Sequence, residues 1–168
     1  MSVEERRYKK DDCIAYNSKN EHFILSNMYC CKLRVDNNVF YGVDCYYYWC
    51  LARLVGDEKL EKDIIKCKGV CACFEAKRKF QKKFNENEVD KKIRFHFIKE
   101  GLRLKVSQCV EFRDILINSS NKNLVEYAPW GDTLWGCVLK GDEYIGVNAC
   151  GRLMMSVRDE LINNELKQ

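Results

Sequence analysis

Two carboxylates stand where carboxylates are unusual. Asp44 comes just before an aromatic run that starts at Tyr46, and Asp132 lies between Trp130 and Trp135 in a loop with two glycines. Aromatic rings beside a fixed carboxylate suit stacking on a base while positive charge on a sugar is stabilised. Plainer interpretations stay open, with Asp44 as a helix N-cap and the tryptophans as core residues.

A second candidate is the segment from Gly146 to Gly151, which leads into a helix expected around Leu153. Two glycines around Asn148 at a helix start would let backbone N–H groups and the helix dipole meet an anion. An ordinary loop that enters a helix is an equal alternative. The chain has neither a Walker loop nor a dinucleotide-binding fingerprint.

The eleven cysteines raise the question of a metal site, a nucleophile or disulfides. The close pairs are Cys30-Cys31 and Cys71-x-Cys73, which lack the C-x-x-C spacing of zinc sites, and only two histidines are available. The cysteine count is odd and the spacings are irregular. We therefore expect reduced, buried thiols that act as small hydrophobic groups, with no metal and no cofactor.

The middle of the chain is basic. From Lys59 to Lys105 it holds 15 Lys and Arg against 7 Asp and Glu, a net charge of +8. Such a stretch could attract a phosphate-bearing partner or nucleic acid, although solvated helix faces are the more common explanation. No apolar run approaches the roughly 18 residues of a membrane span, and the polar start does not resemble a signal peptide. We expect a cytoplasmic protein without a membrane partner.

The elements that must position these residues are mostly helical. With 168 residues, one proline and nine glycines, the chain has room for one core and few turns. Alternating residues over 32–41 predict a hairpin, and Leu124 and Val125 predict a buried strand. Helices are expected over residues 46–54, 57–66, 70–84, 89–106 and 109–117 and around 153–161. The fold class is therefore mainly α with a small antiparallel β-sheet, in a single compact domain.

No repeat, low-complexity tract or linker marks a boundary within the chain. The first twenty residues are polar, so we expect a loose N-terminal arm over 1–20 and one folded domain over 21–168. Residues 131–146 are punctuated by glycines and are expected to form a loop.

The order of several motifs resembles the NADAR family, also called YbiA-like, from about His22 to Leu161. The resemblance rests on Leu25-Ser26-Asn27 with Tyr29, the hairpin, Asp44 before an aromatic helix, Leu124-Val125-Glu126, Asp132-x-x-Trp135-Gly136, and Gly146-x-Asn148-x-x-Gly151-x-x-x-Met155-x-Val157-Arg158. The last two motifs are specific in combination.

The resemblance implies a YbiA-like fold and hydrolysis of an N-glycosidic bond in an ADP-ribosyl or ribosyl-phosphate conjugate. Examples are ADP-ribosylated guanine in DNA and an intermediate of riboflavin synthesis. Cleavage builds oxocarbenium character at the anomeric carbon, so nearby carboxylates stabilise it and orient water. The implied partners are an ADP-ribose or ribosyl-phosphate ligand and ADP-ribosylated nucleic acid.

The residues that match the family are expected to form the site. Catalysis is assigned to Asp44, Asp132 and Trp135, and substrate binding to Asn27, Arg78, Gly136, Asn148, Gly151 and Arg158. Arg78 matches a loosely aligned Gly-Arg position, and Trp135 is expected to stack on the ligand.

The chain also departs from the family pattern. The family usually has Ser-x-Glu-His-x-Tyr-Gln at the helix start, where this chain reads Gly42-Val43-Asp44-Cys45-Tyr46-Tyr47-Tyr48. Asp44 is one methylene shorter than Glu, and a family tryptophan in the middle helical region is missing. A second hypothesis therefore stays open, in which a catalytically weakened module binds or sequesters ADP-ribose-type nucleotides.

Overall fold

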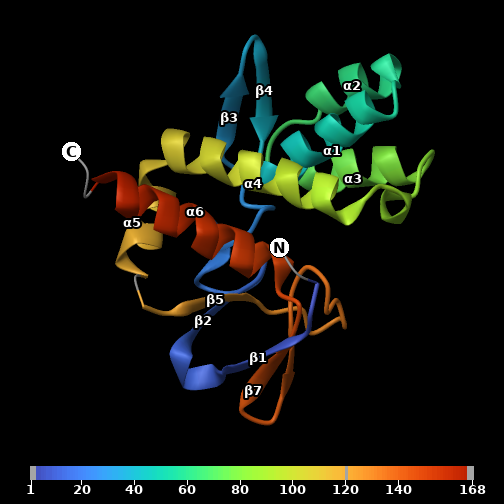
Figure 1. Cartoon of the computed structure of the whole chain (residues 1–168). Coiled ribbons are helices and arrows are strands. Elements are labelled where there is room, and N and C mark those ends of the chain that lie inside the picture. Colours follow the sequence, from blue (N-terminus) through green and yellow to red (C-terminus); the bar gives the residue numbers. More distant parts are fainter. Residues whose placement is uncertain (1–2, 120, 166–168) are drawn as a thin grey trace. The chain divides into compact units, whose positions relative to one another are not determined.

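The computed structural model describes residues 3–119 and 121–165. The chain divides into two units: a central unit, residues 27–110, and a terminal unit, residues 1–26 and 111–168. Helices predominate and antiparallel strands form small sheets (Figure 1), so the predicted fold class is confirmed.

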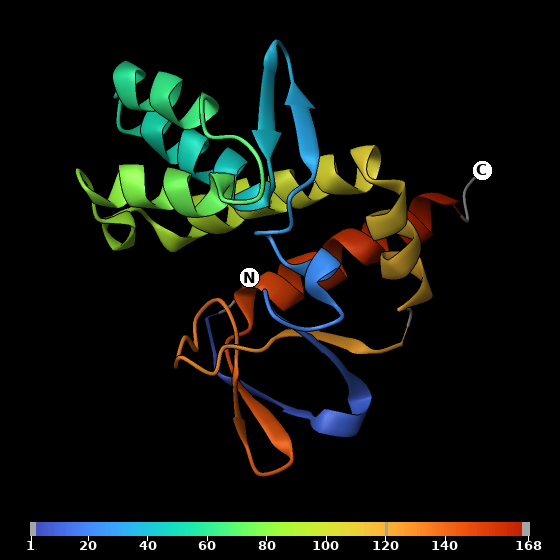
Figure 2. The same ribbon diagram turned by 180° about the vertical axis from the view of Figure 1, so that it is seen from behind.

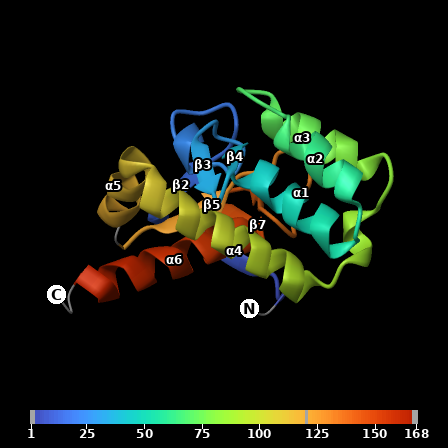
Figure 3. The same cartoon turned by 90° about the horizontal axis from the view of Figure 1, so that it is seen from above.

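The central unit consists of a hairpin followed by four helices, with α1 in contact with the other three (Figure 3). Its elements are β3 (Lys32–Val35), β4 (Asn38–Tyr41), α1 (Val43–Leu54), α2 (Glu58–Ile65), α3 (Ala72–Gln81) and α4 (Lys91–Gln108). Eight of the twelve residues of α1 are buried. Asp44 and Tyr46 in its first two turns are half-buried, and Arg53 and Leu54 at its end are exposed. This helix is the core around which the unit packs.

Local sequence rules account for much of the central unit. The predicted hairpin forms between β3 and β4, and Asp36 adopts the left-handed conformation that the tight turn needs, with φ of 51°. The expected N-cap of α2 forms too, because Asp57 Oδ1 accepts the Leu60 N–H at 2.9 Å.

Gly101 lies inside α4 and not at its end. A Cβ atom at this position would lie 2.8 Å from Val43 Cγ1 and 3.2 Å from Tyr46 Cδ1. The glycine therefore lets α4 approach the first turn of α1 closely, which offsets its poor helix propensity.

The terminal unit combines short strands with two helices (Figure 2). Its elements are β1 (Arg6–Lys9), β2 (Cys13–Tyr16), α5 (Val110–Asn118), β5 (Asn123–Glu126), β6 (Val138–Lys140), β7 (Glu143–Gly146) and α6 (Ala149–Glu165). Strands β1, β7 and β6 form an antiparallel sheet in that order, whereas β2 pairs with β5 in parallel.

Two expectations differ from the structure in this unit. The loose arm expected over residues 1–20 contains β1 and β2, and the loop expected over 131–146 contains the β6–β7 hairpin. Tyr8 explains the first difference: it is buried in a cluster with Val125, Cys137 and Tyr144, which ties a polar strand to the core.

Within residues 3–119 and 121–165, no helix combines the length and apolar character of a membrane span.

Candidate functional site

The first turn of α1 presents Asp44 in a fixed backbone position. Gly42, just before the helix, has φ of 116°, and a Cβ there would lie 2.7 Å from Cys73 Sγ and 3.0 Å from the Tyr29 carbonyl oxygen. The Asp44 N–H donates to the carbonyl oxygen of Asn27 at 3.2 Å. The predicted residues Asn27 and Asp44 therefore meet in the central unit, through the backbone of Asn27.

Asp44 is half-buried and carries an unusual pKa. Burial raises the pKa of its carboxyl from 3.8 to about 6, the negative charge of Glu86 adds to the increase, and the charges of Lys77 and Lys105 oppose it. The carboxyl is therefore mostly ionised at neutral pH but can take up a proton close to that pH. Such a group suits general acid–base chemistry.

Lys105 is the cation that the sequence reasoning missed. It lies on α4 four residues after Gly101, on the helix face that approaches α1, and its side chain is 0% exposed. Burial lowers its pKa to about 8, and the carboxylate of Asp44 is among the groups that oppose the decrease. Its Nζ also lies 5.3 Å from the centre of the Tyr29 ring.

The spacing of Lys105 was a usable signal. It falls at i+7 from Ile98 and i+3 from Leu102, on the buried stripe of an otherwise charged helix. A lysine on such a stripe is rarely fully buried unless an interaction partner accompanies it.

A buried polar network holds the part of α1 that follows Asp44. Glu86 accepts hydrogen bonds from the Tyr47 hydroxyl at 3.0 Å and the Tyr48 hydroxyl at 3.1 Å. Arg94, itself 2% exposed, donates from Nε to the Tyr47 hydroxyl at 3.1 Å and lies 3.5 Å from Glu86. Ties of this kind fix the orientation of α1 and so of its first turn.

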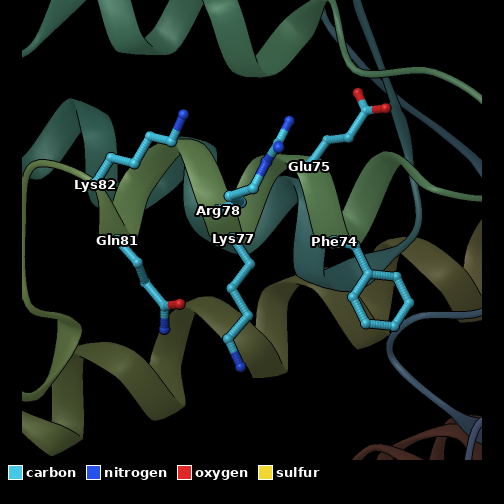
Figure 4. Close-up of a pocket in the computed structure, with 6 residues that line it drawn as sticks. All are labelled: Phe74, Glu75, Lys77, Arg78, Gln81 and Lys82. Carbon is cyan, nitrogen blue, oxygen red and sulfur yellow. The ribbon is translucent and has the colours of Figure 1, made fainter.

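Arg78, the third predicted residue in the central unit, is exposed on α3. It borders a depression of about 520 Å³ on this helix (Figure 4). Lys77 borders the same depression and acts on the charge of Asp44.

The remaining predicted residues lie in the terminal unit, where their side chains and backbones are engaged in the fold. Asp132 Oδ1 accepts the N–H groups of Leu134 at 3.0 Å and Trp135 at 2.9 Å. This bond pair closes a turn and fixes the backbone of the half-buried Trp135. Trp130, in contrast, is 63% exposed and is not a core residue.

The start of α6 favours the plainer alternative, a loop that enters a helix. The Ala149 and Cys150 N–H groups donate to the carbonyl oxygens of Leu134 and Trp135, both at 3.0 Å. These are two of the donors that an anion would need, and the turn after Asp132 already occupies them.

The glycine and asparagine motif instead holds α6 against β5. Asn148, fully buried, accepts the Glu126 N–H at 3.1 Å and donates to the Leu124 carbonyl oxygen at 2.9 Å. A Cβ on Gly151 would lie 2.0 Å from that same carbonyl oxygen, and Met155 Sδ accepts the Leu124 N–H at 3.5 Å. The side chains of Asn148 and Met155 thus form hydrogen bonds with the backbone groups on the edge of β5 that does not pair with β2.

Gly136 and Arg158 have comparable positions. A Cβ on Gly136 would lie 2.4 Å from the Glu126 carbonyl oxygen. Arg158, 6% exposed, donates from one guanidinium nitrogen to Ser119 Oγ at 3.0 Å and to the Lys122 carbonyl oxygen at 2.9 Å. Both residues shape the backbone around β5.

The cysteines carry free thiols, and six of the eleven are buried. Burial raises the pKa of the Cys45 thiol to about 12 and that of Cys31 to about 11. Thiols with pKa values this high are neutral at physiological pH and are poor nucleophiles. In the described part of the chain, no group of three or more His, Cys, Asp or Glu could hold a metal ion.

Comparison with known proteins places this geometry in a family. The family model described as the NADAR domain matches residues 15–162. An N-glycosidase of Acanthamoeba polyphaga mimivirus is 32% identical over 117 residues, 65% of this chain and 67% of that protein. N-glycosidase YbiA of Shigella flexneri is 25% identical over 87% of this chain and 86% of its own length.

A riboflavin biosynthesis protein of Vibrio vulnificus is 25% identical over 146 residues, 87% of this chain, and the match spans 37% of that longer protein. Among solved structures, the NMR structure of the E. coli protein YbiA superposes with a TM-score of 0.74 at 23% identity, covering 96% of this chain and 91% of that one. The predicted YbiA-like fold is confirmed. The family match takes in most of both structural units, and the chain belongs to the NADAR domain family.

Proposed function

We propose that this chain is an N-glycosidase that hydrolyses the N-glycosidic bond of an ADP-ribosyl or ribosyl-phosphate conjugate. The observation that carries the proposal is Asp44, a half-buried residue whose carboxyl pKa is raised to about 6 by burial, with charges from three neighbouring segments acting on it. The N-glycosidase names of two relatives support the reaction class.

In the proposed reaction, the bond from the anomeric carbon to nitrogen breaks and the base leaves with the electron pair. A water molecule attacks the anomeric carbon and passes its proton to Asp44, which also stabilises the developing positive charge on the sugar. The leaving base takes up a proton from bulk water, and Asp44 then releases its proton to bulk water, which restores the carboxylate. Asp44 serves in its ionised form, so it works above its own pKa.

Lys105 acts on this reaction through Asp44. It is fully buried, and its positive charge favours the ionised carboxylate against the cost of burial. We assign it a positioning and tuning role. Lys77, exposed on α3, is the cation placed to meet a phosphate.

For Asp132 we propose a positioning role. One oxygen of its carboxylate holds the Leu134 and Trp135 N–H groups, an arrangement that needs an acceptor and not a proton carrier. Trp135 keeps the stacking role that the family resemblance implies.

The departures at the helix start bear on the rival hypothesis of a binding module without turnover. Cys45 is 0% exposed, and Tyr48 is 4% exposed with its hydroxyl on Glu86, so both changes concern packing within the central unit. The rival then rests on the missing tryptophan of the middle helical region and on the shorter side chain of Asp44, because a small retreat of a catalytic group is costly.

Turnover and binding separate the two hypotheses. The purified protein is incubated with DNA that carries ADP-ribosylated guanosine and, separately, with ribosylated pyrimidine phosphates, and release of free sugar is measured. Release that disappears in Asp44→Asn supports the hydrolase. Calorimetric binding of ADP-ribose without release from either substrate, together with release restored by Asp44→Glu, would establish the binding module.

A further inference from the structure

The exposed face of α3 is an elongated basic groove. Its first part, of about 520 Å³, is bordered by Phe74, Glu75, Lys77, Arg78, Gln81 and Lys82. A second depression of about 500 Å³ is bordered by Gln81, Lys82, Lys83, Phe84, Asn85 and Glu88. Because the two share Gln81 and Lys82, they adjoin along the helix.

Two rows of side chains edge the first part of this groove. Figure 4 shows Phe74, Lys77 and Gln81 extending to one side of α3 and Glu75, Arg78 and Lys82 to the other. The border therefore carries three cations against one carboxylate.

The cations of the first part differ from their neighbours in the same unit. Lys62 and Lys83 lie within ion-pair distance of Glu58 and Asp57. Lys77, Arg78 and Lys82 form no ion pair with the described residues. Their charge is available to an anionic partner.

An aromatic side chain stands among these cations. Phe74 is 60% exposed on a helix whose other large apolar side chain, Phe80, is buried, and Phe84, at the far end of the groove, is half-exposed. The eight residue steps from Phe74 to Lys82 rise about 12 Å along α3. At the axial spacing of about 3.4 Å per phosphate along one strand of B-form DNA, this length corresponds to three to four phosphates. A mononucleotide would not need a groove of this length.

We propose that the groove on α3 binds a single strand of nucleic acid, with bases stacked on Phe74 and phosphates on Lys77, Arg78 and Lys82. A charged track with an exposed aromatic is how strands are held without sequence readout, and a duplex would keep its bases from the ring. For the use of the strand, the inference rests on the proposed function.

Binding is measured first, by fluorescence anisotropy with labelled unmodified oligodeoxythymidylate of about twelve nucleotides. Phe74→Ala is expected to weaken binding about tenfold, while Trp130→Ala, which removes a similarly exposed aromatic, leaves it unchanged. Arg78→Gln with Lys82→Gln is expected to lower the slope of log affinity against log salt by about 1.4. Lys59→Gln with Lys62→Gln is the charge-matched control on α2.

Turnover of a small ADP-ribosylated guanosine separates this inference from the proposed function. Strand binding that depends on Phe74, Arg78 and Lys82, with turnover of the small substrate retained in Phe74→Ala, supports the groove. Wild-type protein that hydrolyses the small substrate but does not bind the strand, or binds a duplex equally well, overturns the groove and leaves the hydrolase standing. Strand binding without any hydrolysis overturns the hydrolase alone. Thermal unfolding confirms that each variant is folded.

Discussion

Asp44 and Asp132 are the two carboxylates that sequence analysis singled out, and their surroundings are opposite in kind. Asp44 holds its charge against burial, with a pKa raised to about 6. Asp132 accepts two backbone N–H groups that close a turn. In the terminal unit, the carboxylate of the recognisable motif serves as a hydrogen-bond acceptor for the backbone. In the central unit, a carboxyl group is buried at a cost in free energy. Buried titratable groups with perturbed pKa values are common at functional sites.

The largest expected effect comes from Asp44→Asn. Removing the carboxylate is expected to lower kcat by about 10² to 10⁴-fold, the usual contribution of a general base. The folded-state pKa of Asp44 lies above its ordinary value of 3.8, so its favourable contribution to stability is complete below that value and is lost as pH rises through about 6. At pH 7 the variant should therefore be more stable than the wild type, by of order 2 kcal/mol.

Asp57→Asn is the matched control, since it removes the same charge at the start of the next helix. It should leave kcat unchanged. Chemical denaturation measures the free energies of unfolding, and a destabilised Asp44→Asn would mean that Asp44 is held for folding.

Gly151→Ala tests the terminal unit, where the glycine and asparagine motif packs α6 against β5. Its Cβ would meet the Leu124 carbonyl oxygen, so α6 must move away from β5, at an expected cost of about 3 kcal/mol. Gly141→Ala, where φ is positive but the space is open, should cost only about 1 kcal/mol. A loss in Gly151→Ala no larger than that in Gly141→Ala would show that the approach of α6 to β5 does not require the glycine.

Asp132 is expected to give a smaller effect that depends on the replacement. Asp132→Ala loses the acceptor for two N–H groups and should lower stability by about 1–2 kcal/mol. Asp132→Asn keeps an acceptor oxygen and should retain both stability and turnover. A turnover defect in Asp132→Asn as deep as that in Asp132→Ala would assign the carboxylate charge itself to catalysis.

The same contrast explains what the sequence could predict. The β3–β4 hairpin and the Asp57 cap follow from neighbouring residues, and both are confirmed. Strand β1 was missed because three of its four residues are charged and only Tyr8 faces the core. Strand pairing is decided by residues far away in the chain.

The candidate site residues, like strand β1, depend on contacts with residues far away in the chain. Of the two alternatives for the segment before Leu153, the structure favours the plain helix-entry loop, because the carbonyl oxygens of Leu134 and Trp135 reach the helix start from a separate loop. Lys105 was missed because a lysine is normally a surface residue, and its burial depends on the close approach of α4 to α1 at Gly101. The roles predicted for Asp44 and Arg78 stay predictions.

The pH dependence of kcat/KM tests the central claim, that an Asp44 carboxylate with a raised pKa carries the hydrolysis. The charged groups that face it are Lys77 from α3, Glu86 from the turn at 86–88 and Lys105 from α4, with the Tyr48 hydroxyl on its own helix. For the wild type we expect kcat/KM to rise with pH through an inflection near 6. Lys105→Met removes a charge that favours the ionised form, so the inflection should move to higher pH. A wild-type kcat/KM that stays constant between about pH 5 and 7, or an inflection that does not move in Lys105→Met, would contradict the assignment of Asp44.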